Sequence, residues 1–181
     1  MATLCPPRSF LIFMLFVCGA GCADVAAGTV ATDGQVQVHY VTGRIGRVTF
    51  VTSNNSKQVS DKDLLQIQIW VENLSGSAKL EYKGWGGEGL SSGQKARLKD
   101  DLGNEYKAVG SGILQKPVGQ KSNESLYPGS SIQDVLVFEV PVDRAQVMHL
   151  TLPRSAYTQD QNGPRALELA IPTSTFNGGD L

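Results

Sequence analysis

The chain has little cysteine, and what it has lies at one end: its three cysteines are Cys5, Cys18 and Cys22. The rest of the sequence therefore has no thiols from which a disulfide framework or a cysteine metal site could form. Removing residues 1–21 leaves about 160 residues, which is the length of one domain. A domain of that size buries roughly 70% of its unfolded surface, so an apolar core alone can stabilise it.

The sequence also lacks a charge imbalance and long apolar runs. It has 16 Lys and Arg against 17 Asp and Glu, for a formal net charge of -1. The basic residues are scattered singly and form no stripe that could neutralise phosphates, so we expect no nucleic-acid partner. An uncharged apolar run covers residues 10–17. This run is too short for a membrane-spanning helix, which needs about 20 residues.

The run at residues 10–17 is instead typical of a secretory signal. It follows a single basic residue, Arg8, and precedes small residues that lead to Cys22. We predict a signal peptide at residues 1–21, a lipid on Cys22, and a lipid-attachment and tether segment at residues 22–34.

One position departs from the usual lipoprotein signal. Gly19 stands three residues before Cys22, where a branched apolar residue is typical. Ordinary cleavage after Ala20 or Ala23, which would release a soluble secreted protein, is the alternative.

Most of the remaining sequence alternates apolar and polar residues with a period of two, which is typical of strands with one buried face. The clearest case places Leu65, Ile67, Ile69 and Val71 on one face and leaves Trp70 on the polar face. Further strands are expected at residues 36–40, 48–52, 78–82, 94–99, 105–109, 132–140, 147–152 and 166–171.

These segments predict the fold class. Short strands separated by turn signals, with no amphipathic helical stretch, favour an all-β, immunoglobulin-like antiparallel sandwich of about eight or nine strands. We assign this sandwich to residues 35–172 and expect a flexible tail at residues 173–181. The segment 132–140 is apolar on both faces for part of its length, which predicts a central strand.

Several motif matches lack the context that their chemistry needs. The glycine-rich segment 84–89 fits a dinucleotide fingerprint but is followed by no predicted helix, so we expect no cofactor. Ser91 lies in a nucleophile-elbow pattern without the strand-to-helix turn, and His149 is the one later histidine. Met148 and His149 are neighbours on a strand and face opposite ways, so we expect no metal site. A hydrolase using Ser91 or the acidic turn at Asp100 remains an alternative.

The aromatic residues are the candidate ligand or partner contacts. Trp70 is expected on a polar strand face, and Tyr82 and Trp85 flank the glycine-rich segment. Exposed rings of this kind can form a platform for a sugar or a peptide. The alternative is a structural role, with the rings covered by neighbouring segments. A carbohydrate-binding module would require these rings to share one exposed face.

Several of these segments together resemble a family of bacterial envelope proteins without an assigned activity. The similarity extends over most of residues 35–172 and is carried by strand and turn segments at 65–73, 81–85, 97–100, 103–106, 127–129, 134–141 and 150–153. It resembles planctomycete examples with telokin-like, immunoglobulin-type sandwiches. The resemblance implies that fold and an exported, lipid-anchored state, and it brings no catalytic residues.

The sequence thus predicts an exported binding or scaffolding module without catalytic activity, located in the periplasm or cell envelope. Its expected partners are a membrane, through the lipid on Cys22, and a protein or glycan. A carbohydrate-binding module and an envelope hydrolase are the functional alternatives, and a soluble secreted protein is the alternative location.

Overall fold

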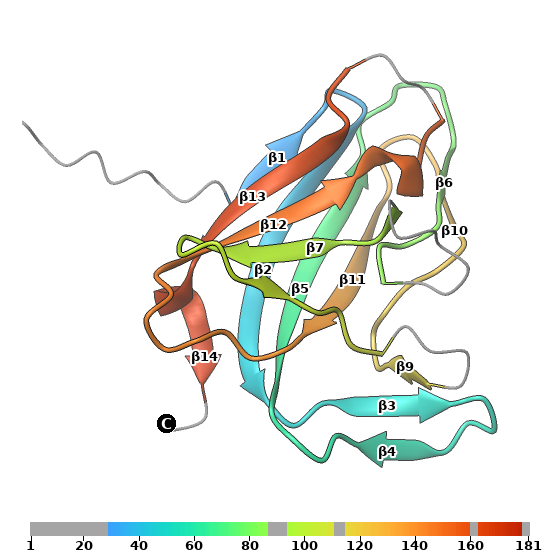
Figure 1. Cartoon of the computed structure of the whole chain (residues 1–181). Coiled ribbons are helices and arrows are strands. Elements are labelled where there is room, and N and C mark those ends of the chain that lie inside the picture. Colours follow the sequence, from blue (N-terminus) through green and yellow to red (C-terminus); the bar gives the residue numbers. More distant parts are fainter. Residues whose placement is uncertain (1–28, 87–93, 111–114, 160–162, 179–181) are drawn as a thin grey trace, which may run out of the picture.

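The computed structural model describes residues 29–86, 94–110, 115–159 and 163–178. Its largest sheet has the strand order β1-β2-β5-β11, with β14 also pairing with β2 (Figure 1). All of these pairs are antiparallel except β14 with β2. The strands are β1 (Val30–Thr32), β2 (Val36–Gly46), β5 (Leu64–Asn73), β11 (Ser131–Phe138) and β14 (Phe176–Gly178).

A second sheet lies across the first and has the order β13-β12-β7-β8 (Figure 1). All of its pairs are antiparallel. The two stacked sheets confirm the predicted all-β sandwich. The described part of the chain contains no α-helix. The strands of this sheet are β7 (Arg97–Asp100), β8 (Glu105–Tyr106), β12 (Val147–Pro153) and β13 (Ala166–Pro172).

The core lies between the two sheets and is built by alternate residues of their strands, as the period of two predicts. In β5 every second residue from Leu65 to Val71 is buried, whereas Trp70 on the other face is 42% exposed. The inward side chains of both sheets form one cluster, which includes Val36, Val38, Leu65, Ile67, Ile69, Val71, Leu98, Met148, Leu150, Leu152, Leu167, Leu169 and Ile171.

Two smaller sheets complete the described fold. One has the order β4-β3-β9 and the other pairs β10 with β6. In Figure 1 the hairpin of β3 and β4 lies at one end of the sandwich. All three residues of β4 are exposed and show no apolar alternation, so β4 is not among the strands expected from the sequence. The bounds are β3 (Thr49–Thr52), β4 (Lys57–Val59), β6 (Leu80–Tyr82), β9 (Gln115–Pro117) and β10 (Glu124–Leu126).

The prediction that segment 132–140 is a central strand is wrong. β11 stands at the end of the strand order of its sheet. Its second face is apolar because Val135 and Val137 pack in a separate small cluster with Val48, Phe50 and Leu64. The apolar residues on both faces of β11 therefore indicate a second hydrophobic cluster and not a central position in the sheet.

Both ends of the predicted domain also need correction. The tether was expected to extend to residue 34, but β1 begins at Val30 and pairs with β2. The tail was expected to be flexible from residue 173, but β14 pairs with Gly43–Ile45 of β2. Gly43 permits this pairing, because a Cβ there would lie 2.3 Å from the Phe176 ring. β1 and β14 thus divide the outer edge of β2 between them and protect it.

The described part of the chain contains no helix that is long and apolar enough to span a membrane.

Candidate functional site

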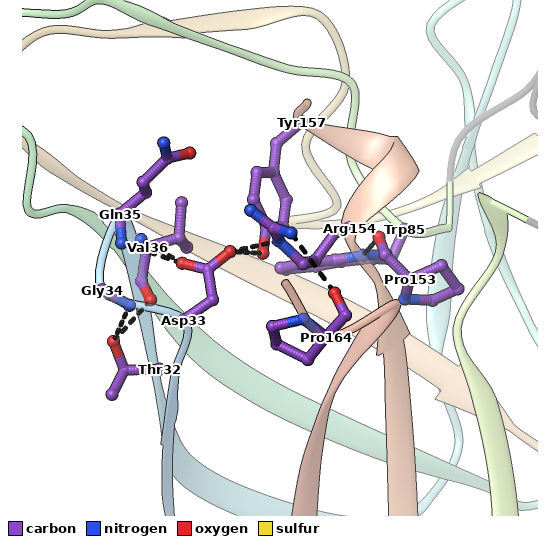
Figure 2. A network of polar contacts seen from close by, with 10 residues as sticks. All are labelled: Thr32, Asp33, Gly34, Gln35, Val36, Trp85, Pro153, Arg154, Tyr157 and Pro164. Carbon is purple, nitrogen blue, oxygen red and sulfur yellow. Dashed lines mark hydrogen bonds and ion pairs between the residues drawn. The ribbon is translucent and has the colours of Figure 1, made fainter. Parts of the chain in front are cut away.

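A buried ion pair joins the two sheets at one end of the sandwich (Figure 2). Asp33 lies in the turn between β1 and β2, and Arg154 begins the short 3-10 helix η2 (Arg154–Ala156) after β12. The Arg154 Nε donates to Asp33 Oδ2, and the two side chains are 6% and 0% exposed. Tyr157 Oη donates to the same carboxylate oxygen over 2.8 Å. One carboxylate therefore binds two groups from the η2 segment that follows β12.

The turn itself orients the Asp33 carboxylate. Its Oδ1 accepts hydrogen bonds from the backbone amides of Gln35 and Val36, at 2.9 and 2.8 Å. Burial raises the pKa of Asp33, but these amides, the Tyr157 hydroxyl and the Arg154 charge outweigh it and lower the pKa below its ordinary value. Asp33 is therefore ionised at neutral pH, as the ion pair requires.

Aromatic rings pack beneath the ion pair. Trp85 contacts Tyr82 and Tyr157 edge to face, with ring centroids 5.1 and 6.0 Å apart. Its indole Nε1 donates to the Pro153 carbonyl over 2.9 Å, directly before Arg154 in the chain. The aromatic group thus holds the backbone from which the Arg154 side chain extends.

A groove of about 730 Å³ opens beside η2. Three cationic residues line it, Lys83, Arg154 and Arg165, and its other walls include Gln94, Ser155 and Thr158. No aspartate or glutamate lines the groove among the residues that the structure describes. Gly163 approaches Arg154 closely with φ +106°, and a Cβ there would lie 3.0 Å from Arg154 Nη1. The described lining of the groove is polar and basic, which suits an anionic ligand.

The structure separates the three predicted aromatic contacts. Trp70 is 42% exposed on the outer face of the first sheet, as its place on the polar strand face predicted. Tyr82 and Trp85 are both fully buried, so their assignment as surface contacts is wrong. Their rings fill the end of the core, and a Trp at the border of a glycine-rich segment carries no local sign of burial. A shared exposed platform of the three rings is thereby excluded.

Trp70 has polar neighbours on its own face. In the sheet register it stands opposite His39 of β2 on one side and Gln133 of β11 on the other. Gln68 and Glu72 lie two residues away on the same face of β5. An exposed tryptophan surrounded by polar side chains is the composition of a binding hot spot with a polar rim.

The other predicted site residues are not brought together. Ser91 and Cys22 lie outside the described residues. Asp100 accepts hydrogen bonds from the Leu102 and Asn104 amides, the Asn104 side chain and the Tyr106 hydroxyl, at 2.6–3.0 Å. Burial raises the pKa of Asp100, but these hydrogen bonds lower it to about 2. The carboxylate thus stabilises the hairpin turn and is a weak base.

The two histidines lie on different sheets. His149 is exposed on β12 while Met148 is fully buried, which confirms that they face opposite ways. His39 Nε2 contacts Gln37 Nε2 at 2.7 Å on the other sheet. Within the described ranges, no three His, Cys, Asp or Glu side chains gather as metal ligands.

Sequence reasoning missed the groove and its ion pair. Asp33 was placed in the tether, and Arg154 follows a strand end without any motif. The signal that could have suggested a role for Asp33 is the Thr-Asp-Gly turn pattern at residues 32–34, which is typical of an Asx turn. Nothing local links it to Arg154, which lies 121 residues away.

Comparisons with known proteins bear on the fold alone. No family model and no curated protein matches the chain. Among solved structures, the yjhA protein of Bacillus subtilis has a TM-score of 0.53 at 11% identity, covering 83% of this chain and 98% of that one. The candidate lipoprotein ycdA of Bacillus subtilis has a TM-score of 0.49 at 13% identity, covering 81% of this chain and 39% of that one. The likeness to yjhA is a likeness of fold.

Proposed function

We propose that the chain is an exported, lipid-anchored module of the cell envelope that binds a protein partner and carries out no catalysis. We also propose that it belongs with the telokin-like, immunoglobulin-type envelope sandwiches that its sequence resembles. The observation that carries the binding proposal is Trp70, 42% exposed on an ordered strand between two polar neighbours. Tryptophan is the residue type most enriched in interface hot spots.

The anchor would hold this surface close to a membrane. The domain begins at β1, so eight residues, Cys22 to Thr29, connect the proposed lipid to Val30. A fully extended segment of that length reaches roughly 27 Å. The tether would therefore let the sandwich turn while keeping it within about one domain diameter of the bilayer.

We expect Cys22 to carry the lipid. Cells that express the full chain and are fed an alkyne-labelled fatty acid should yield a labelled protein in the membrane fraction. Cys22→Ser should abolish the label, because Cys22 is the one cysteine that remains after the predicted signal peptide is removed, whereas Cys18→Ser should keep it. Equal labelling of both variants would show that the lipid is not on Cys22, and an unlabelled protein in the medium would show that the chain is secreted without an anchor.

We expect the partner to contact the Trp70 face. A photoreactive residue introduced at Gln68, two residues from Trp70, should give a discrete protein adduct in intact cells of the native host. Trp70→Ala should reduce the yield of that adduct about tenfold or more, because truncating a hot-spot tryptophan costs about 2 kcal/mol or more of binding free energy. The matched control places the same probe at Lys99, which is exposed on β7 of the opposite sheet.

The control decides how the result is interpreted. An adduct at Gln68 that is absent at Lys99 and lost with Trp70→Ala supports a protein-binding face. Adducts of equal yield at both positions, or an adduct that survives Trp70→Ala, would refute it.

A further inference from the structure

The groove beside η2 collects cationic side chains from distant parts of the sequence. Lys83 follows β6 and Arg165 precedes β13, and both are exposed. In the described part of the chain neither forms an ion pair. The third cation, Arg154, is compensated by Asp33. The uncompensated positive charge of the described lining therefore comes from Lys83 and Arg165.

Backbone hydrogen bonds hold these two cationic residues next to the two ends of the same short helix, η2. The Lys83 amide donates to the Ala156 carbonyl over 2.9 Å, and the Arg154 amide donates to the Arg165 carbonyl over 3.1 Å. Arg154 Nη1 also donates to the Pro164 carbonyl over 3.3 Å. The positions from which Lys83 and Arg165 extend are thus set by η2, which the buried ion pair holds in place.

Neutral polar groups provide the rest of the lining. The Gln94 side chain donates to the Ser155 carbonyl over 3.2 Å and so lies directly against η2. Ser155, Thr158 and Gln159, whose side chains carry hydroxyl and amide groups, line the same space. Such groups exchange hydrogen bonds with hydroxylated ligands, and a volume of about 730 Å³ lies in the usual range of small-molecule sites.

We propose that this groove binds an acidic saccharide: a hydroxylated ligand whose carboxylate or phosphate lies between Lys83 and Arg165. The cations account for the anionic group, and the hydroxyl and amide lining accounts for the sugar hydroxyls. Two uncompensated cations in the described lining are too few for a nucleic acid, which is bound by a basic stripe. The proposal is independent of the Trp70 face, which lies on the other sheet.

Calorimetric titration of the purified protein with defined sugars tests the proposal. The probes are trigalacturonate, which carries carboxylates, its methyl-esterified and uncharged counterpart, and glucose 6-phosphate. We expect saturable binding of trigalacturonate or of glucose 6-phosphate, and which of the two binds identifies the anionic group. The esterified trimer should bind at least about tenfold more weakly, because it keeps the hydroxyls and loses the charge. Binding of neither charged probe would overturn the proposal, as would equal binding of the esterified trimer.

Charge variants locate the site. Lys83→Gln and Arg165→Gln should each weaken binding of the charged sugar about three- to tenfold, and raising the salt should weaken wild-type binding in the same direction. The matched control is Lys57→Gln, an exposed lysine on β4 at the other end of the sandwich (Figure 1). A loss with Lys57→Gln as large as with Lys83→Gln would mean general attraction to the protein surface and would overturn the groove as the site. The amide dispersion of NMR spectra confirms that each variant is folded.

Discussion

Replacing Asp33 by Asn is expected to lower the free energy of unfolding by about 3 kcal/mol, because it leaves the Arg154 guanidinium buried without its counter-charge. The carboxylate accepts from two backbone amides, from Tyr157 and from Arg154. Asn can still accept from the amides, but its NH2 group would face the donors of Arg154 and Tyr157. Urea unfolding of the chain without residues 1–21, at pH 7, measures the loss.

A double-mutant cycle provides the control for this prediction. Arg154→Gln alone should also be destabilising, because it leaves the Asp33 charge without its partner. The double variant Asp33→Asn with Arg154→Gln should lose less than the sum of the single losses, because no unpaired charge remains. Additive losses would show that the two charges do not interact in solution.

Acid should reveal the same interaction. The pKa of Asp33 is lower in the folded chain than its ordinary value of 3.8. The stability that Asp33 contributes is therefore complete above about pH 4 and is lost as the pH falls through its native pKa. The stability advantage of the wild type over Asp33→Asn should shrink over that range and should not vary between pH 5 and 7.

A second large effect is expected at Asp134, with the opposite dependence on pH. This carboxylate is fully buried in the sandwich and accepts from the Tyr82 hydroxyl at 2.5 Å and from the Lys121 and Val135 amides at 2.7 Å. Burial raises the pKa of Asp134 to about 6, although these hydrogen bonds and the Lys116 charge lower it. The raised pKa means that the folded chain favours the protonated carboxyl.

The stability linked to Asp134 is therefore present below its ordinary pKa of 3.8 and is lost as the pH rises through about 6. Between pH 4 and 8 the wild type should lose about 3 kcal/mol relative to Asp134→Asn, since each pKa unit corresponds to about 1.4 kcal/mol. Denaturant unfolding of both proteins at several pH values measures the difference, which is insensitive to any constant cost of the Asn side chain.

Tyr82→Phe is the matched control at this position. It keeps the carboxyl of Asp134 and removes a hydroxyl that stabilises its charged form, so the loss of stability should start at the same low pH and extend to higher pH. Parallel pH profiles for the wild type and Asp134→Asn would refute the prediction.

The sequence predicted the architecture well where residue alternation is regular. Leu65, Ile67, Ile69 and Val71 were assigned to the core and Trp70 to the outer face, and the structure agrees. The sequence did not predict the short strands that have little alternation, such as β4 and β14. Their pairing depends on β3 and β2 rather than on their own residues.

The candidate sites divide along the same line. Trp70 could be found from the sequence because a strand exposes every second side chain to the same face. The sequence by itself therefore determined the fold class and the outward orientation of Trp70. Only the tertiary structure decided that Trp85 is buried and that Asp33 meets Arg154 beside a basic groove. The reason is physical: alternation is a local property, whereas these contacts depend on how two sheets stack across 121 residues of sequence.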